Sequence, residues 1–87
     1  MKDIQIHHDN IAKHGITEDE VRECFRPGQR KYKRKVGRKV YRLISQTLEG
    51  RYLELLYTDR GAEIFVFHAM DARARDIRLF KRRGKHR

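Results

Sequence analysis

The chain has 87 residues, of which 22 are Lys or Arg and 12 are Asp or Glu, and its formal net charge is +10. This length allows one domain and excludes folds built from several. The charge predicts a polyanionic partner, with nucleic acid first, an acidic protein second and a membrane surface third, and no run approaches the 18 apolar residues of a membrane-spanning helix.

The first twenty residues predict a short strand followed by a short helix. Residues 4–6 alternate apolar and polar side chains, as an edge strand does. Asp9 is the expected N-cap of a helix of little more than one turn. Gly15 follows it, at the position where a left-handed residue ends a helix.

A second helix is marked by a capping box. Thr17 can accept a hydrogen bond from the amide of Glu20, and the Glu20 carboxylate can reach back to Thr17. Val21 and Cys24 then fall on one helical face, which we expect to pack on the sheet. The Pro-Gly pair at 27–28 ends this helix.

The segment 26–42 carries nine Lys or Arg and no acid. Within it, residues 31–35 have two interpretations of equal weight. They form either an additional strand or a mobile basic loop.

Residues 39–68 are the centre of the predicted fold. They contain three apolar and aromatic runs, at 40–48, 51–58 and 62–68, which are separated by glycine-containing turns. This pattern is typical of an antiparallel meander.

After His68 the period changes to that of a helix. Asp71 is the expected N-cap, and Ala74, Ile77 and Phe80 recur at three-residue spacing. Residues 81–87 form a basic C-terminal tail that we predict to be too charged to pack.

These elements predict an α+β fold with an antiparallel sheet of three to five strands, two N-terminal helices and one C-terminal helix. We expect a single domain over residues 1–80, with the helices on one face of the sheet. The other face is left free for function. No signal peptide opens the chain, so a cytoplasmic protein is expected.

The basic residues form two runs that could border the same sheet face. Nine lie in 26–42 and eight in 73–87. Such a face attracts phosphates through counterion release. Tyr41, Tyr52 and Tyr57 could stack on unpaired bases, but each one taken singly is better explained as a half-buried core or edge residue.

The residues support one kind of catalysis better than the others. The adjacent pair His7 and His8 points to opposite sides of an extended segment, so no metal site is predicted. Cys24 lies on the core-facing stripe and is expected to be an inert thiol. RNA cleavage without a metal needs only a base, an acid and cations, and His68, at the end of the third strand, has the best-suited ordinary pKa. The alternative is a histidine that merely closes a strand.

The chain also resembles a known family. Residues 10–17 read N-I-A-K-H-G-I-T and are followed by Glu20, Val21 and Phe25, which resembles the opening of BrnT-type toxins. Residues 67–72, with Asp76 and Phe80, resemble the closing pattern of the same family. These proteins are the toxin halves of type II toxin–antitoxin modules.

The resemblance implies a RelE-like fold and an endoribonuclease that uses no metal or other cofactor. It also implies an antitoxin partner, usually with a ribbon-helix-helix DNA-binding portion, that masks the toxin and represses the operon. His14 and His68 correspond to residues that line the site, and Asp76 stands at the position of the family acid.

Three positions depart from the family pattern. Met70 replaces an arginine, Asp76 replaces a glutamate and Phe80 replaces a tyrosine. Met70 removes a charge that would face the phosphate. Either Arg73 or Arg75 takes over this charge, or the chain is a weakened or non-cleaving relative.

The resulting hypothesis is a metal-independent endoribonuclease that cleaves RNA. The predicted catalytic residues are His68, His14, Asp76 and Arg75. The predicted phosphate-binding residues are Arg42, Arg51, Arg60, Arg73 and Arg78. Two alternatives are a non-catalytic nucleic-acid-binding module on the same scaffold and an interaction protein whose basic surface seats an acidic partner.

Overall fold

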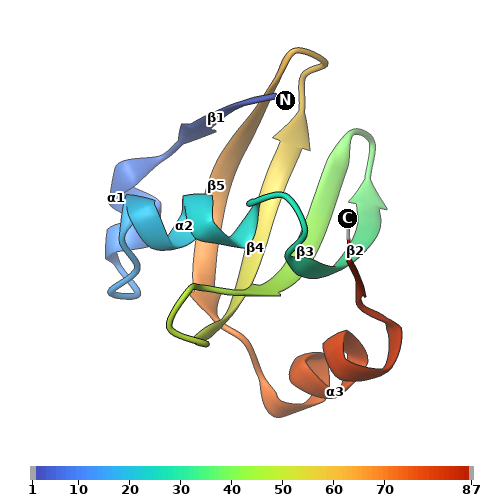
Figure 1. The fold of residues 1–87 in the computed structure, drawn as a ribbon. Coiled ribbons are helices and arrows are strands. Elements are labelled where there is room, and N and C mark those ends of the chain that lie inside the picture. Colours follow the sequence, from blue (N-terminus) through green and yellow to red (C-terminus); the bar gives the residue numbers. More distant parts are fainter. Residues whose placement is uncertain (1, 87) are drawn as a thin grey trace.

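The structure is a computed structural model that describes residues 2–86. Its elements follow in the order β1 (Asp3–Ile6), α1 (His8–Ala12), α2 (Glu18–Cys24), β2 (Arg30–Gly37), β3 (Val40–Gln46), β4 (Tyr52–Asp59), β5 (Glu63–Asp71), α3 (Ala74–Arg83) and β6 (Lys85–His86) (Figure 1). The predicted α+β class, the two N-terminal helices and the C-terminal helix are confirmed. No helix in this part of the chain is long and apolar enough to cross a membrane.

All the strands belong to one sheet, in the order β1-β5-β4-β3-β2-β6. The strands from β2 to β5 are antiparallel neighbours, which confirms the meander and settles residues 31–35 as part of a strand. At one edge β1 runs parallel to β5, and at the other the two-residue β6 pairs with β2. The sheet thus has five strands of ordinary length and one short edge strand.

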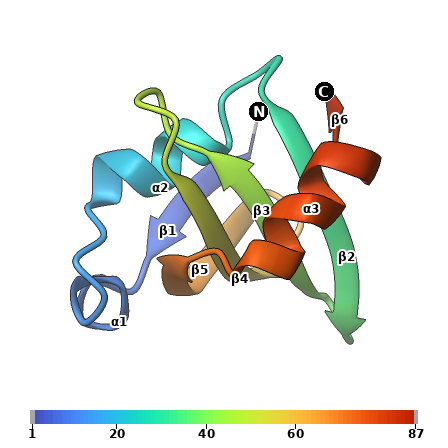
Figure 2. The same cartoon turned by 90° about the horizontal axis from the view of Figure 1, so that it is seen from below.

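The helices lie on both faces of the sheet, so the prediction that they share one face is wrong (Figure 2). Side chains of a strand alternate between faces, and Leu43 and Leu53 belong to the core with α2. The residues adjacent to them, Arg42 and Tyr52, instead contact Asp76 and Phe80 of α3. We call these the apolar face, covered by α1 and α2, and the polar face, part of which is covered by α3. The buried side of α3 carries Asp76, and the polar face provides Arg42 as its cation.

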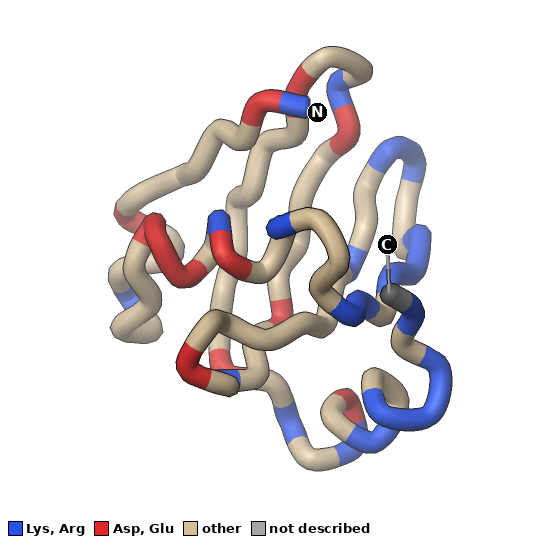
Figure 3. The backbone as a smooth tube through the Cα atoms, viewed as in Figure 1, with Lys and Arg blue, Asp and Glu red and all other residues tan. Residues whose placement is uncertain are grey.

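The charges are separated in space as well as in sequence. In Figure 3 the basic positions gather along β2, β6 and the second half of α3, while the acidic positions lie away from these elements, with a group on α2. Three acids occupy the first turn of α2, where they favour the positive end of the helix dipole.

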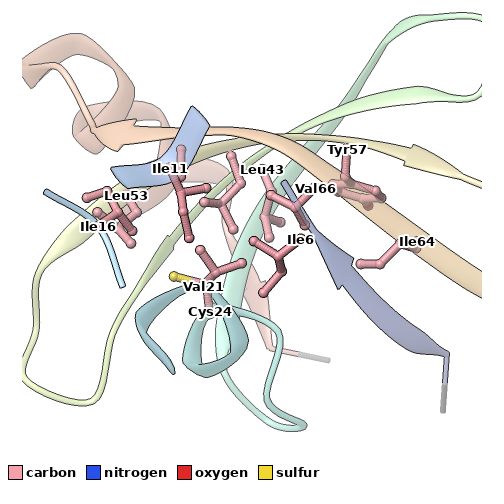
Figure 4. Packing of buried hydrophobic residues seen from close by; sticks show 12 residues of the cluster. Ile6, Ile11, Ile16, Val21, Cys24, Leu43, Leu53, Tyr57, Ile64 and Val66 are labelled. Atoms are coloured by element: carbon pink, nitrogen blue, oxygen red, sulfur yellow. The ribbon is translucent and has the colours of Figure 1, made fainter. Parts of the chain in front are cut away.

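The core lies between α2 and the apolar face of the sheet (Figure 4). Val21 and Cys24 are fully buried against a cluster that includes Leu43, Leu55 and Val66. Burial of one such side chain stabilises the fold by about 1.5–3 kcal/mol. It also raises the pKa of the Cys24 thiol to about 12, and the predicted place of Cys24 on the core-facing side of the helix is confirmed.

The start of α2 is built as the sequence predicts. The Thr17 N–H donates to Glu20 Oε1 at 2.9 Å, and the Glu20 N–H donates to Thr17 Oγ1 at 3.2 Å. Gly15 adopts φ +67°, a left-handed conformation that costs glycine little. The chain can therefore turn sharply from α1 into α2.

The two other predicted caps are wrong. His7 is the N-cap of α1, and its Nδ1 accepts from the Asn10 N–H at 3.3 Å, so Asp9 lies inside the first turn. Asp71 is still the last residue of β5, and Arg51 holds its carboxylate. The N-cap of α3 is Arg73, whose side chain makes no capping hydrogen bond.

Most of the predicted basic tail is ordered, because α3 continues to Arg83 and β6 follows it. Residue 87 lies outside the described residues. Arg30 caps the end of α3 by donating to the carbonyl oxygens of Gly84, at 3.1 Å, and Lys81, and its guanidinium lies over the Phe80 ring. A side chain at Gly84 would collide with the Phe80 carbonyl, so glycine is needed at this close approach.

Candidate active site

A buried ion cluster lies between the polar face of the sheet and α3. Arg42 Nη2 is 2.7 Å from Glu54 Oε2 and 2.6 Å from Asp76 Oδ1, and Arg42 Nε donates to the same Glu54 oxygen at 3.2 Å. Each residue comes from a different element, β3, β4 and α3 respectively. The cluster therefore fixes α3 on the sheet by charge, in addition to the apolar contact of buried Phe80 with Tyr52.

The cluster is charged and poorly solvated. Asp76 and Glu54 keep only 1% and 8% of their surface exposed. Burial disfavours the charged form of Arg42, but its hydrogen bonds to Asp76 and Glu54 outweigh burial and raise its pKa. With both acids ionised the three formal charges sum to −1. Asp76 Oδ2 has no hydrogen-bond partner within the described residues, so this oxygen can accept a further donor.

His68 lies beside this cluster. Its Nε2 is 3.7 Å from Glu54 Oε1, the oxygen that Arg42 does not use, and 28% of its side chain is exposed. The His14 ring meets the His68 ring edge-to-face, with the centroids 5.7 Å apart. Two imidazoles, one of them facing a carboxylate, therefore share one surface. This arrangement suits proton transfer, because the carboxylate stabilises the positive charge that a proton brings to the ring.

A β-bulge places His68 on the polar face. Tyr57 pairs with Val66, but Leu56 pairs with His68, so Phe67 is an extra residue on β5. Without it, His68 would share the apolar face with Val66, two residues earlier. The bulge reverses the alternation and leaves Ala69 in the core.

The bulge is tied to α1. The Asn10 side chain donates from Nδ2 to the Phe67 carbonyl at 2.9 Å. The helix therefore supplies the hydrogen bond for a carbonyl of the unpaired residue. His14 follows α1 by two residues, so the hydrogen bond from Asn10 to the Phe67 carbonyl also fixes His14 and His68 relative to each other.

Arg51 anchors the turn that carries His14. It donates to Asp71 Oδ1 at 2.8 Å and to Glu20 Oε2 at 3.0 Å, and Nη1 also reaches the Gly15 carbonyl at 3.3 Å. The hydrogen bond to Arg51 lowers the pKa of Asp71. Arg51 thus connects the start of α2 to the end of β5.

Three of the four predicted catalytic residues come together here. His14 and His68 touch, and Asp76 joins them through Arg42 and Glu54. Arg75 precedes Asp76 on α3 and is exposed. Its predicted role stays a prediction.

The predicted phosphate-binding residues do not form one group. Arg42 and Arg51 are held in ion pairs. Arg60 lies over the Phe65 ring beyond the end of β4, roughly 13 Å along the strand from the residue that pairs with His68. Arg73 and Arg78 are exposed on α3. Of the five, these two are exposed cations next to or within the helix that carries Asp76.

The three tyrosines are occupied by intramolecular contacts. Tyr57 is 5% exposed on the apolar face, where burial raises its pKa to about 12, and Tyr41 stacks on it. Tyr52 meets the Phe80 ring edge-to-face. The interpretation as half-buried core or edge residues therefore fits all three, including Tyr41, which is half-buried against the core.

The sequence-based prediction missed Glu54 and Asn10 as site residues. Glu54 is the lone acid between Leu53 and Leu55 in a strand, and a charge in an apolar run signals a buried partner. Asn10 was recognised only as part of a motif. The hydrogen bond of Asn10 to the Phe67 carbonyl depends on a β-bulge that no local sequence pattern predicts.

Within residues 2–86 no group of three or more His, Cys, Asp or Glu side chains could hold a metal ion. The candidate site as a whole contains two imidazoles, a buried pair of carboxylates and surface cations on α3. Comparison with known proteins adds nothing to this geometry, since no family model, curated protein or solved structure matches the chain.

Proposed function

We propose that this protein is a metal-independent endoribonuclease with a RelE-like fold, the toxin of a BrnT-like toxin–antitoxin pair. The observation that carries the proposal is the contact between His14 and His68, with His68 backed by Glu54. The order of two short helices, a meander and a final helix agrees with the fold that the sequence resemblance implies. The net charge of +10 suits an RNA substrate.

In this proposal the two histidines divide the proton transfers. His14, the more exposed, takes the proton from the ribose 2′-hydroxyl, and the oxygen attacks the adjacent phosphorus. His68 gives its proton to the 5′-oxygen as the P–O5′ bond breaks, and a 2′,3′-cyclic phosphate forms. Glu54 stabilises protonated His68 before the step. The proposal assigns the neutralisation of the phosphorane to Arg73 and Arg75, which are exposed at the start of α3.

Asp76 acts here as a positioning residue. It touches Arg42 rather than His68, and Arg42 in turn fixes the Glu54 carboxylate. A change at Asp76 should therefore alter the alignment of Glu54 with His68 and leave both imidazoles in place.

The experiment is incubation of total RNA with the purified protein in EDTA, beside His68→Ala, His14→Ala and His8→Ala. His8 is a matched control because it is exposed on α1 and contacts Glu18, away from the cluster. We expect cleavage with cyclic phosphate ends by the wild type and His8→Ala. Either site variant should lose at least about a hundredfold in rate.

Intact RNA with the wild-type protein would contradict catalysis. Equal cleavage by all four proteins would point to a contaminating nuclease. Cleavage that needs added Mg²⁺ would contradict the metal-independent mechanism.

Met70 favours a second candidate, a non-catalytic nucleic-acid-binding module. It pairs with Glu54 across β4 and β5, where the resembled family carries an arginine. This candidate predicts RNA binding that weakens steeply with salt and no cleavage. Met70→Arg should then create activity, and Met70→Leu should not.

The first proposal includes a partner. A small antitoxin with a ribbon-helix-helix portion would mask the toxin. Co-expression with the neighbouring open reading frame, followed by purification of a complex, tests this part separately from cleavage.

A further inference from the structure

The apolar face of the sheet is not covered along its whole length. The helix α2 has only seven residues, and it ends at Cys24 with Phe25 as its C-cap. Beyond Phe25 a pocket of about 590 Å³ opens on the exposed half of β2 and β3. It lies on the opposite side of the sheet from the histidine pair.

Aromatic rings form the inner wall of this pocket. Tyr57 is buried, and Tyr41 stacks on it with centroids 5.5 Å apart and an interplanar angle of 21°. Phe25 closes one side by meeting Tyr57 edge-to-face at 5.4 Å. Since Tyr41 is only half-buried, part of its ring stays available to a planar ligand.

Cations form the outer wall, and no acid lines the pocket. Lys31, Lys33 and Lys35 alternate along β2 and so point to this face together, and Arg83 and Lys85 approach from the end of α3 and from β6. Lys33 and Lys35 are exposed on their strand. The Lys33 ammonium lies over the Tyr41 ring, 4.7 Å from its centroid.

We propose that this pocket binds a nucleoside phosphate. The base lies on the Tyr41 ring, in the place now taken by the Lys33 ammonium. Lys33 swings aside on its flexible stem and, with Lys35, binds the phosphate. The volume lies within the range of small-molecule sites, and a stacking ring beside unopposed cations is the arrangement that recognises a base and its phosphate together.

The pocket continues into a smaller hollow of about 220 Å³, with Phe25, Lys33 and Tyr57 common to both. The ligand can therefore be a free nucleotide or one unpaired nucleotide of a longer chain. Every base has a stacking face, so we expect little preference among the four bases.

The test is titration of the ¹⁵N-labelled protein, followed by amide chemical shifts, with UMP, AMP and ribose 5-phosphate. A deoxythymidine tetranucleotide, which lacks the 2′-hydroxyl and cannot be cleaved, represents the chain. We expect UMP and AMP to shift the amides of β2 and β3 and to bind at least about fivefold more tightly than ribose 5-phosphate. A tetranucleotide that binds more tightly than UMP identifies the chain as the source, and equal binding identifies the free nucleotide.

Matched variants locate the site. Lys33→Ala and Lys35→Ala should each weaken UMP binding about fivefold, whereas Arg34→Ala, on the same strand but the other face, should leave it unchanged. Tyr41→Leu should weaken binding at least about fivefold, and Tyr41→Phe, which keeps the ring, should retain it. His68→Ala should bind UMP normally, so failure of the ribonuclease proposal and failure of this one are distinguishable.

Three results would overturn the proposal. One is equal binding of ribose 5-phosphate and UMP, which would leave an anion site without base recognition. Another is an equal loss in Arg34→Ala, which would indicate nonspecific attraction. The third is shifts of the same amides by a glutamate octapeptide but not by UMP, which would assign the pocket to an acidic protein segment.

Discussion

Each face of the sheet is covered by a helix, but the contacts that hold the helix differ in their chemistry between the two faces. On the apolar face, α2 is held by fully buried side chains such as Val21 and Leu55. On the polar face, α3 is held by Arg42 between two carboxylates as well as by the Phe80 ring against Tyr52. The residues concerned are neighbours on the same strands, because Glu54 and Leu55 differ by one position.

This difference separates stability from chemistry. Apolar contacts depend on volume and tolerate little change in shape, whereas charges must be paired or they destabilise. The protein keeps His68 and the buried carboxylates Glu54 and Asp76 on the face that a helix covers only in part. His68 can therefore be exposed beside a carboxylate that is itself buried.

The largest effect should come from breaking the ion cluster. Arg42→Met leaves Glu54 and Asp76 buried without their cation and should lower the free energy of unfolding by about 3–5 kcal/mol. Urea denaturation measures it. The triple change Arg42→Met, Glu54→Leu and Asp76→Leu removes all three charges and should restore most of this stability. A cost below about 1 kcal/mol for the single variant would show that the cluster contributes little.

The apolar face should respond to a lost side-chain volume. Leu55→Ala removes a fully buried side chain and should cost about 3 kcal/mol. The control is Leu56→Ala, one residue along β4 and half-buried on the polar face, which should cost less. Urea midpoints of the two variants compare the faces directly, and equal losses would contradict the assignment of the core to one face.

A variant next to the bulge tests what holds His68 on the polar face. Asn10→Ala removes the hydrogen bond to the Phe67 carbonyl and should cost about 1 kcal/mol of stability. It should also displace His14 from His68, which a change in the NMR shifts of both imidazoles would report. Lys13→Ala, an exposed change at the C-cap of α1, serves as control. Unmoved imidazoles in Asn10→Ala would show that the bulge holds without α1.

The smallest effect concerns the contacts that join α2 to β5. The backbone N–H of Thr17 and the Arg51 guanidinium lower the pKa of Glu20 below 4.5, and Arg51 lowers that of Asp71 below 3.8. Both carboxylates therefore contribute stability above these ordinary values, and the contribution is lost as pH falls through the folded pKa. Thermal midpoints from pH 7 to pH 3 should fall less steeply below pH 4.5 in Arg51→Met. Parallel profiles would assign the acid sensitivity to other groups.

The fold was predictable where local signals agree. The capping box at Thr17 and Glu20 and the glycine turns of the meander each determine a geometry within a few residues. The two caps that failed show the limit of such signals. His7, not Asp9, is the N-cap of α1, and Asp71 is bound by Arg51, which lies just before β4. A cap depends on which partner is nearest in space.

The two histidines of the candidate site could be predicted from the sequence, but the contacts that bring them together could not. His68 followed from its ordinary pKa and strand-end position and from the family resemblance, His14 from the resemblance alone, and the two rings do meet. Their meeting depends on an extra residue at Phe67, which shifts the alternation without any mark in composition. The ion cluster joins β3, β4 and α3, and single-element periodicity contains no information about such three-way contacts.

The exposed lysines of β2 have one more consequence. Within residues 2–86, Arg30 and Lys31 are the only residues of this strand that pair with β6, so in this part of the chain the rest of β2 is an open border of the sheet. An uncapped border can template the addition of a foreign strand, and dense like charge prevents such growth. Chemical acetylation of these lysines would remove that protection, and the protein would then be expected to aggregate by strand-to-strand association.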